Sequence, residues 1–148
     1  MQDTVLILGA GGFLGRYISH EYVRQGFRVI GVGRSAPPRH EIERFIQGDL
    51  LDMNLKAVFR EERPRLVVNA AGSASVDKSF SSPYEDWQQT VQMQAVVLDA
   101  IRQSETGSFY VYLSSAAVYG EPTHLPITED MPCRPISPYG MHKWQAEL

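Results

Sequence analysis

The sequence predicts an α/β fold in which helices cover both faces of a doubly wound parallel sheet, and three observations lead to this prediction. Short β-rich runs alternate with helical patterns along the chain, as they do in parallel sheets. The first run, Thr4–Leu8, is continuously apolar, as expected for a strand that is buried on both faces. A glycine-rich loop, Gly9–Gly15, follows this run directly and precedes a segment in which apolar residues recur at helical spacing.

The other elements follow from periodicity and from residues that end helices and strands. The helix after the glycine loop is expected to stop at Gly26. Further strands are expected at Arg28–Val32, Arg44–Ile46, Leu66–Asn69 and Ser108–Ser114, and further helices at Asn54–Glu62 and Pro83–Arg102. The apolar residues on one side of the first helix are Phe13, Leu14, Tyr17, Ile18, Tyr22 and Val23, and those on one side of the long helix are Trp87, Val91, Ala95, Leu98 and Ile101.

The last part of the chain differs in character. Five prolines lie between Glu121 and Pro138, which predicts a surface loop without regular structure. Ser137 and Pro138 then suit the cap and the first position of a final helix.

Composition limits the classes of function. The 148 residues are about one domain long, and 43% hydrophobic and 21% charged residues are ordinary values for a globular protein. The net charge of −3 and the lack of a Lys/Arg run predict no nucleic-acid or membrane partner. All apolar runs fall below the roughly 20 residues of a membrane span. The lone Cys133 fits a reducing, cytoplasmic location, and no His/Cys cluster predicts a metal site.

The glycine loop predicts a binding site for the pyrophosphate of NAD or NADP. Gly9 allows the tight turn, Gly12 lets backbone N–H groups approach the phosphates, and Gly15 lets the helix pack close to the strand. The N-terminus of the helix supplies donors and partial positive charge. The alternative is an ordinary loop with accidental glycines, which the strand before it and the helix after it disfavour. The spacing G-x-x-G-x-x-G resembles that of the short-chain dehydrogenase/reductase superfamily.

The choice between NAD and NADP depends on the end of the second strand. An acidic residue there normally binds the ribose 2′-hydroxyl, whereas arginine accommodates a 2′-phosphate. This chain has Gly33 followed by Arg34, which slightly favours NADP. The alternative is that Arg34 is a solvated turn residue that stacks on the adenine, which is compatible with NAD.

Three residues are candidates for chemistry. Tyr139 and Lys143 lie four apart on the predicted final helix, so that both side chains project from one face. A neighbouring ammonium favours the phenolate form of a tyrosine, which then accepts a proton. Ser115 follows the fifth strand, at the edge of the sheet where ligands of parallel sheets bind. A tyrosine and a lysine at this spacing are often mere surface residues, and a serine there is often a turn residue, so the assignment depends on their place in the chain.

The segments Tyr112–Gly120 and Pro138–Lys143 resemble the extended short-chain dehydrogenases, which include nucleotide-sugar epimerases, dehydratases and reductases. The resemblance covers essentially the whole chain and implies a Rossmann-type fold. It implies that Ser115 orients the sugar hydroxyl, that Tyr139 is the catalytic acid/base and that Lys143 binds the nicotinamide ribose. It further implies that Asp49 binds the adenine amino group, although a turn cap is an equally ordinary role for that residue. The expected cofactor-binding residues are Gly9, Gly12, Phe13, Leu14, Gly15, Arg34, Asp49, Leu50, Ala70, Ala71, Gly72 and Lys143.

Departures from the family pattern narrow the prediction. The 4,6-dehydratases carry an Asp-Glu pair where this chain has Ala116 and Ala117, so dehydration is disfavoured. Family members usually carry Asn-Val-x-Gly in the long helix, where this chain has Thr90–Met93. A structural hydrogen bond of the family is therefore not expected to be kept here. Family members usually form dimers through this helix.

Two hypotheses for the function remain, and they differ in how they account for the end of the chain. Family members continue well past the position of Leu148, so we expect an incomplete dinucleotide-binding domain, truncated after the fifth strand and the start of the catalytic helix, with the substrate domain absent. The first hypothesis is an NAD(P)-dependent epimerase or reductase that acts on a nucleotide sugar, at least in the parent protein. The alternative is a non-catalytic NAD(P)-binding module or an inactive fragment.

Overall fold

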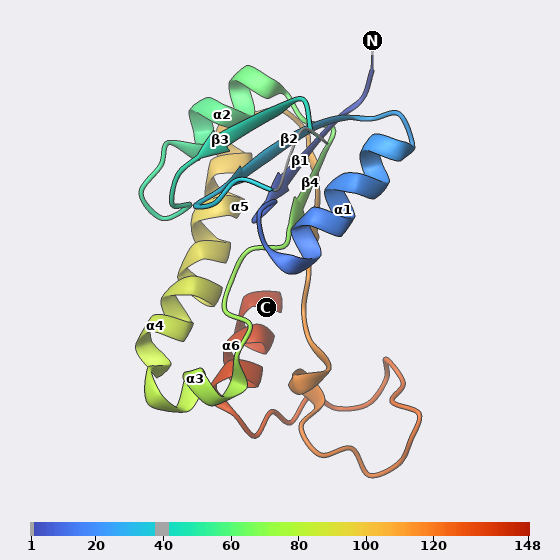
Figure 1. The fold of residues 1–148 in the computed structure, drawn as a ribbon. Coiled ribbons are helices and arrows are strands. Elements are labelled where there is room, and N and C mark those ends of the chain that lie inside the picture. Colours follow the sequence, from blue (N-terminus) through green and yellow to red (C-terminus); the bar gives the residue numbers. More distant parts are fainter. Residues whose placement is uncertain (1, 38–41) are drawn as a thin grey trace. The chain divides into compact units, whose positions relative to one another are not determined.

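The computed structural model describes residues 2–37 and 42–148, which form two compact units. The first unit extends to Ala71 and includes Val96–Leu113, and the second comprises Gly72–Ala95 and Ser114–Leu148. Figure 1 shows the elements of both along the chain.

The first unit contains a parallel sheet of five strands in the order β3-β2-β1-β4-β5. The chain adds strands outward from β1 in one direction and then in the other, which is the doubly wound topology of the prediction. The predicted α/β Rossmann-type class is therefore confirmed. The strands are β1 (Thr4–Leu8), β2 (Arg28–Gly33), β3 (Arg44–Gln47), β4 (Leu66–Asn69) and β5 (Phe109–Tyr112). Four of the predicted strands agree within one residue, whereas β5 is shorter at both ends than predicted.

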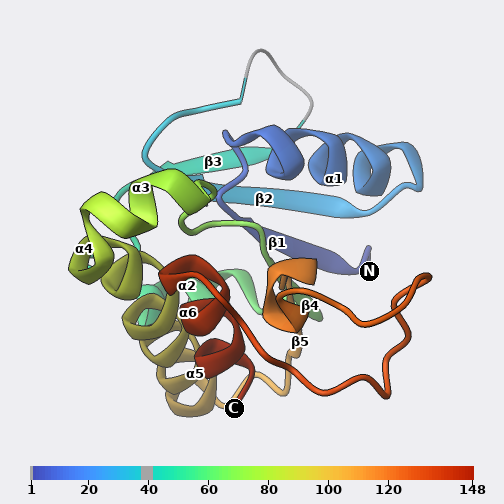
Figure 2. The ribbon, with the colours of Figure 1, turned by 90° about the horizontal axis from the view of Figure 1, so that it is seen from below.

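The central strand β1 is buried along its whole length because side chains of both faces are covered. Val5 and Ile7 belong to a core cluster with residues of neighbouring strands, against which Ile18 and Tyr22 of α1 (Phe13–Arg24) pack. Side chains alternate along a strand, so Leu6 lies on the opposite face. Figure 2 shows α1 on one face of the sheet and α2 (Leu55–Glu62) on the other.

The helix α1 buries only part of the side that its apolar residues predict, because Ile18 and Tyr22 pack on the core while the others do not. Phe13, Leu14 and Tyr17 are each more than half exposed, while Gly15 and Ser19 are buried. A Cβ at Gly15 would lie 2.1 Å from the Gly9 carbonyl oxygen, so the backbones of helix and loop are almost in contact. Such close packing leaves room only for small residues at the interface, and the large ones are displaced to the rim.

The second unit is mainly helical. It contains α3 (Val76–Ser81), α4 (Pro83–Trp87), the π turn η1 (Gln88–Gln92), the start of α5 (Met93–Ser104), the 3₁₀ turn η2 (Ala116–Tyr119) and α6 (Pro138–Glu147). Ser137 caps α6 by accepting a hydrogen bond from the Gly140 N–H at 3.1 Å, as predicted. The segment between η2 and α6 contains no helix or strand, which confirms the predicted loop. The short α3 was not predicted.

The long helix predicted at Pro83–Arg102 exists as three consecutive pieces, because η1 interrupts it and α5 continues to Ser104. Its predicted apolar side is wrong: Ala95 and Leu98 are exposed, and Met93, Val97 and Ala100 are buried. A π turn holds one residue more than an α turn, so it rotates the buried side of the helix away from the regular pattern.

No helix in the described part of the chain has the length and apolar character needed to cross a membrane.

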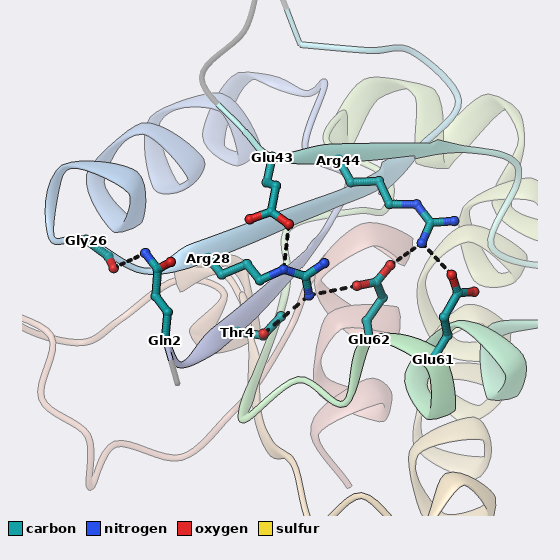
Figure 3. A network of polar contacts seen from close by, with 8 residues as sticks. All are labelled: Gln2, Thr4, Gly26, Arg28, Glu43, Arg44, Glu61 and Glu62. Atoms are coloured by element: carbon teal, nitrogen blue, oxygen red, sulfur yellow. Dashed lines mark hydrogen bonds and ion pairs between the residues drawn. The ribbon is translucent and has the colours of Figure 1, made fainter.

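A network of charges joins β2, β3 and α2 in the first unit (Figure 3). The Glu62 side chain is only 3% exposed and forms ion pairs with Arg28, at 2.8 Å, and with Arg44. Arg28 also binds Glu43 at 2.7 Å, and Arg44 binds Glu61. One buried carboxylate thus connects two neighbouring strands to the helix that covers them.

We expect Glu62→Ala to lower the free energy of unfolding by about 2 kcal/mol, because it leaves two guanidinium groups without their buried partner while solvent still screens both. Glu61→Ala is the matched control, since Glu61 also pairs with Arg44 but is 60% exposed, and it is expected to change stability by less than about 1 kcal/mol. Urea unfolding measures both values. Equal losses in the two variants would show that burial of Glu62 contributes nothing.

Candidate functional site

The glycine loop lies at the carboxyl ends of β1, β2 and β4. Gly9 has a φ of +78°, which favours glycine, and its N–H donates to the Val32 carbonyl at 2.8 Å. A Cβ at Gly9 would lie 2.7 Å from the Ala71 nitrogen. The small residues Ala70 and Ala71 after β4 therefore pass directly beside the loop.

Gly11 is a second position that tolerates no side chain, and sequence reasoning missed it. A Cβ there would lie 1.8 Å from the Ser35 carbonyl oxygen, which follows β2. At Gly12, by contrast, the one close neighbour of a Cβ is the Gly9 carbonyl oxygen at 3.2 Å. Gly11 is thus required by packing within the protein, whereas Gly12 borders more open space.

The N-terminus of α1 offers backbone donors. The first helical hydrogen bond links the Arg16 N–H to the Gly12 carbonyl at 3.1 Å, so the N–H groups of Phe13, Leu14 and Gly15 precede the hydrogen-bonded helix. The cap residue, Gly12, has no side chain to accept from them. These N–H groups are therefore positioned to bind an anion such as a phosphate.

The remaining candidates of the first unit lie after β2 and β3. Arg34 is exposed, and its carbonyl accepts a hydrogen bond from the Gln47 side chain at 3.1 Å. Asp49 Oδ1 accepts from the Leu51 N–H at 3.0 Å, which is the turn-capping role considered as the alternative. Leu50 is buried. Because Arg34 is exposed, its side chain is accessible to a ligand.

In the second unit, η2 and α6 bring Ser115 and the start of the last helix together. Ser115 caps η2 by accepting from the Ala117 N–H at 3.2 Å. A Cβ at Gly140 would lie 2.5 Å from the Ala117 carbonyl oxygen, so α6 packs on η2 backbone to backbone. Gly140 is the neighbour of Tyr139, and two of the three predicted catalytic residues therefore come from adjoining turns.

Tyr139 and Lys143 lie on one side of α6, as predicted. The Lys143 ammonium lies 5.8 Å from the centre of the Tyr139 ring. The Tyr139 N–H donates to the buried Ser79 hydroxyl at 3.1 Å, and this hydroxyl donates to the Val76 carbonyl at 2.6 Å. A single serine of α3 thus holds the backbone at the tyrosine.

Lys143 is 5% exposed, which is unusual for a lysine. Burial lowers the pKa of its ammonium below the usual value, and the negative charges of Asp86 and Glu147 oppose this shift. A Cβ at Gly72, where φ is +132°, would lie 4.0 Å from its Nζ atom. The end of the Lys143 side chain therefore lies beside Gly72, where the positive φ, rather than the lysine, favours glycine.

One polar pair near these residues was not predicted. His142 Nδ1 lies 2.6 Å from Asp86 Oδ2, and the side chains are 13% and 2% exposed. The two residues are 56 positions apart and follow no sequence motif, so no signal in a single sequence could have revealed them.

The predicted site residues form two groups. The glycine loop, Arg34, Asp49, Leu50, Ala70 and Ala71 belong to the first unit, and Gly72, Ser115, Tyr139 and Lys143 belong to the second. Among the residues that the structure describes, no group of three or more His, Cys, Asp or Glu side chains is arranged to hold a metal ion.

Comparison with known proteins gives a consistent result. The chain is 32% identical, over 97% of its length, to a UDP-glucose 4-epimerase of Lactobacillus helveticus. It matches the crystal structure of UDP-glucose 4-epimerase from Brucella ovis in complex with NAD, with a TM-score of 0.91 and 31% identity over 98% of the chain. A UDP-glucose 4-epimerase from Stenotrophomonas maltophila, with bound NAD and formylated UDP-arabinopyranose, matches with a TM-score of 0.89 and 25% identity over 99% of the chain.

The chain spans less than half of these relatives, namely 44% of the first, 46% of the second and 47% of the third. The model of the NAD dependent epimerase/dehydratase family matches residues 5–148, almost the whole chain. This match, on a doubly wound sheet with the glycine loop after its first strand, shows that the chain belongs to the NAD dependent epimerase/dehydratase family.

Proposed function

We propose that this chain supplies the NAD-binding part and the acid/base residues of an epimerase that acts on a nucleotide sugar, with a UDP-hexose as substrate. The observation that carries the proposal is the placement of Ser115, Tyr139 and Lys143 on the adjoining η2 and α6. A protein that only bound the cofactor would need no such set. The names of the relatives favour an epimerase over a reductase.

The residues of the first unit fit a dinucleotide. The N–H groups at the start of α1 and the open side of Gly12 suit the pyrophosphate, with Phe13, Leu14 and Gly15 forming the first turn around it. Asp49 and Leu50 are proposed to meet the adenine, and Ala70 and Ala71 to allow the close passage of the cofactor. Gly72, the first residue of the second unit, is proposed to have the same role. The complexes of relatives contain NAD, which does not support the slight preference for NADP inferred from Arg34. Bound NAD would accept a hydride from the sugar and return it.

The residues of the second unit would manage the proton. As the reacting sugar carbon gives up its hydride, Tyr139 Oη takes the proton of the hydroxyl group on that carbon. Tyr139 would give the proton back once the hydride had returned to the opposite face of the sugar carbon, so that the sugar would be neither oxidised nor reduced overall. Ser115 would orient the hydroxyl, and Lys143 would bind the nicotinamide ribose and stabilise the phenolate. Ala116 and Ala117 provide no groups to expel water, which argues against dehydration.

We also propose that the chain corresponds to the cofactor-binding portion of its longer relatives, and that residues outside these 148 select the sugar. The relatives are about twice as long as the aligned chain.

The purified chain tests the proposal directly. NADH binding is followed by its fluorescence, and conversion of UDP-galactose to UDP-glucose is followed by chromatography. Binding with conversion supports the epimerase. Binding without conversion would leave the alternative, a cofactor-binding module, for this polypeptide. Failure to bind NADH would contradict the proposal for the first unit.

The choice of cofactor has its own test. We expect the chain to bind NAD more tightly than NADP, and Arg34→Ala to weaken NADP binding about tenfold while NAD binding changes less than about twofold, because only a 2′-phosphate pairs with the guanidinium. Calorimetric titration measures the four dissociation constants. Arg24→Ala, which removes an exposed arginine elsewhere, controls for the change in net charge. Equal weakening of both cofactors by Arg34→Ala would assign Arg34 to the adenine instead.

A further inference from the structure

A buried polar pair, Asp86 on α4 and His142 on α6, lies close to the candidate catalytic residues but is not one of them. The carboxylate only accepts hydrogen bonds, so at a separation of 2.6 Å the proton between the two groups comes from His142 Nδ1. Both side chains are almost fully covered, and the other carboxylate oxygen, Oδ1, is buried without a hydrogen-bond partner among the described residues. A buried carboxylate oxygen without a hydrogen-bond partner destabilises the folded state, so stability by itself does not explain why Asp86 is buried here.

The position of the pair on α6 relates it to the chemistry. His142 immediately precedes Lys143 and lies three residues after Tyr139 on the same helix. The directions of all three side chains therefore depend on how α6 is rotated about its own axis. The elements α3, α4, η1 and η2 all pack against α6. Among the α6 contacts described above, the bond from His142 to Asp86 is a charge-assisted one and is therefore strong and directional.

Asp86 also acts on Lys143 through space. Its negative charge raises the pKa of the Lys143 ammonium against the effect of burial. The same carboxylate therefore touches one residue of α6 and acts electrostatically on the next. By comparison, its neighbour Glu85 is 46% exposed and forms an ion pair with Lys78 at 2.8 Å.

We propose that Asp86 and His142 are positioning residues that hold α6 in the rotation at which Tyr139 and Lys143 meet the substrate and the cofactor. This inference rests on the proposed function, which assigns Tyr139 and Lys143 their roles toward the substrate and the cofactor. Neither residue touches the reacting atoms; His142 acts through the helix and Asp86 acts through His142 and Lys143. Their loss then affects the rate of the chemical step more than the binding of ligands.

Kinetics of variants test the proposal. We expect Asp86→Asn and His142→Ala each to lower kcat for UDP-galactose at least tenfold, with the NAD dissociation constant and KM within about twofold. Because the two residues act as one pair, the double variant should be no slower than the slower single variant. His142→Asn places an amide nitrogen near the position of Nδ1 and should restore kcat to within about threefold of the wild type. Glu85→Gln, the matched control, should leave kcat unchanged.

A second readout requires no turnover. In NMR spectra of the labelled chain, the ring signals of Tyr139 and the side-chain signals of Lys143 should shift in Asp86→Asn and His142→Ala, and return in His142→Asn. If the wild type converts no substrate, the proposed function fails and these signals alone decide about the pair; if Asp86→Asn does not fold, the His142 variants decide. Signals that do not move, a kcat within twofold of the wild type in either single variant, or effects that multiply in the double variant would overturn the inference.

Discussion

Tyr139→Phe is expected to lower the rate of nucleotide-sugar conversion about 10³-fold, which makes it the most damaging conservative change for activity. The substitution removes one oxygen atom, the proposed site of proton transfer, and leaves the ring that lies beside the Lys143 ammonium. The backbone N–H of residue 139 still reaches the Ser79 hydroxyl. The helix α6 therefore keeps its place, and NADH binding should change less than about twofold.

Conversion of UDP-galactose and fluorescence titration with NADH measure the two quantities for Tyr139→Phe. Tyr119→Phe makes the same chemical change on η2 and should retain full activity. Undiminished turnover in Tyr139→Phe would remove Tyr139 from its acid/base role. A parallel loss of NADH binding would show that the oxygen serves the cofactor site instead.

The largest expected effect on stability comes from Gly15→Ala. The added Cβ would lie 2.1 Å from the Gly9 carbonyl oxygen and 2.9 Å from the Ala10 Cα, and neither is a side chain that can turn aside. The helix α1 would have to move away from the loop, which opens the core where Ile18 and Tyr22 pack. We expect the free energy of unfolding to fall by about 4 kcal/mol. Urea denaturation measures the loss.

Gly12→Ala is the matched change three residues earlier. Its Cβ would lie 3.2 Å from one carbonyl oxygen. The free energy of unfolding should therefore stay within about 1 kcal/mol of the wild-type value. The same methyl group would stand where the phosphates are proposed to approach, and NADH binding should weaken about tenfold or more. If Gly12→Ala proved as unstable as Gly15→Ala, the distinction between packing and ligand approach in this loop would be lost.

Local rules predicted the features that depend on a few neighbouring residues. The apolar run Thr4–Leu8 reveals a buried strand because both of its faces are covered. Ser137 caps α6 through a hydrogen bond to a residue three positions later, and Pro138 is the first residue of that helix. The handedness of parallel connections restricts the possible orders of the strands, but it does not fix the observed order.

Features that depend on tertiary packing were not predictable in this way. The buried side of α1 is set by the approach of Gly15 to Gly9, which displaces Phe13 and Tyr17 toward solvent although their spacing is regular. The short helix α3 has no apolar period, and a serine side chain caps it. Asp86 and His142 meet only because α4 packs on α6.

The π turn Gln88–Gln92, which lies between α4 and α5, limits which changes in chain length this segment can accept. Deleting one residue within the turn would let the helices on either side join as a regular α-helix, but it would rotate one by about 100° relative to the other. Asp86 lies before the turn and Met93 directly after it. A deletion within the turn would therefore change the angle about the helix axis between these two side chains, although both residues were retained. A substitution within the turn leaves this rotation unchanged, whereas the insertion or deletion of a single residue changes it by about 100° in one step.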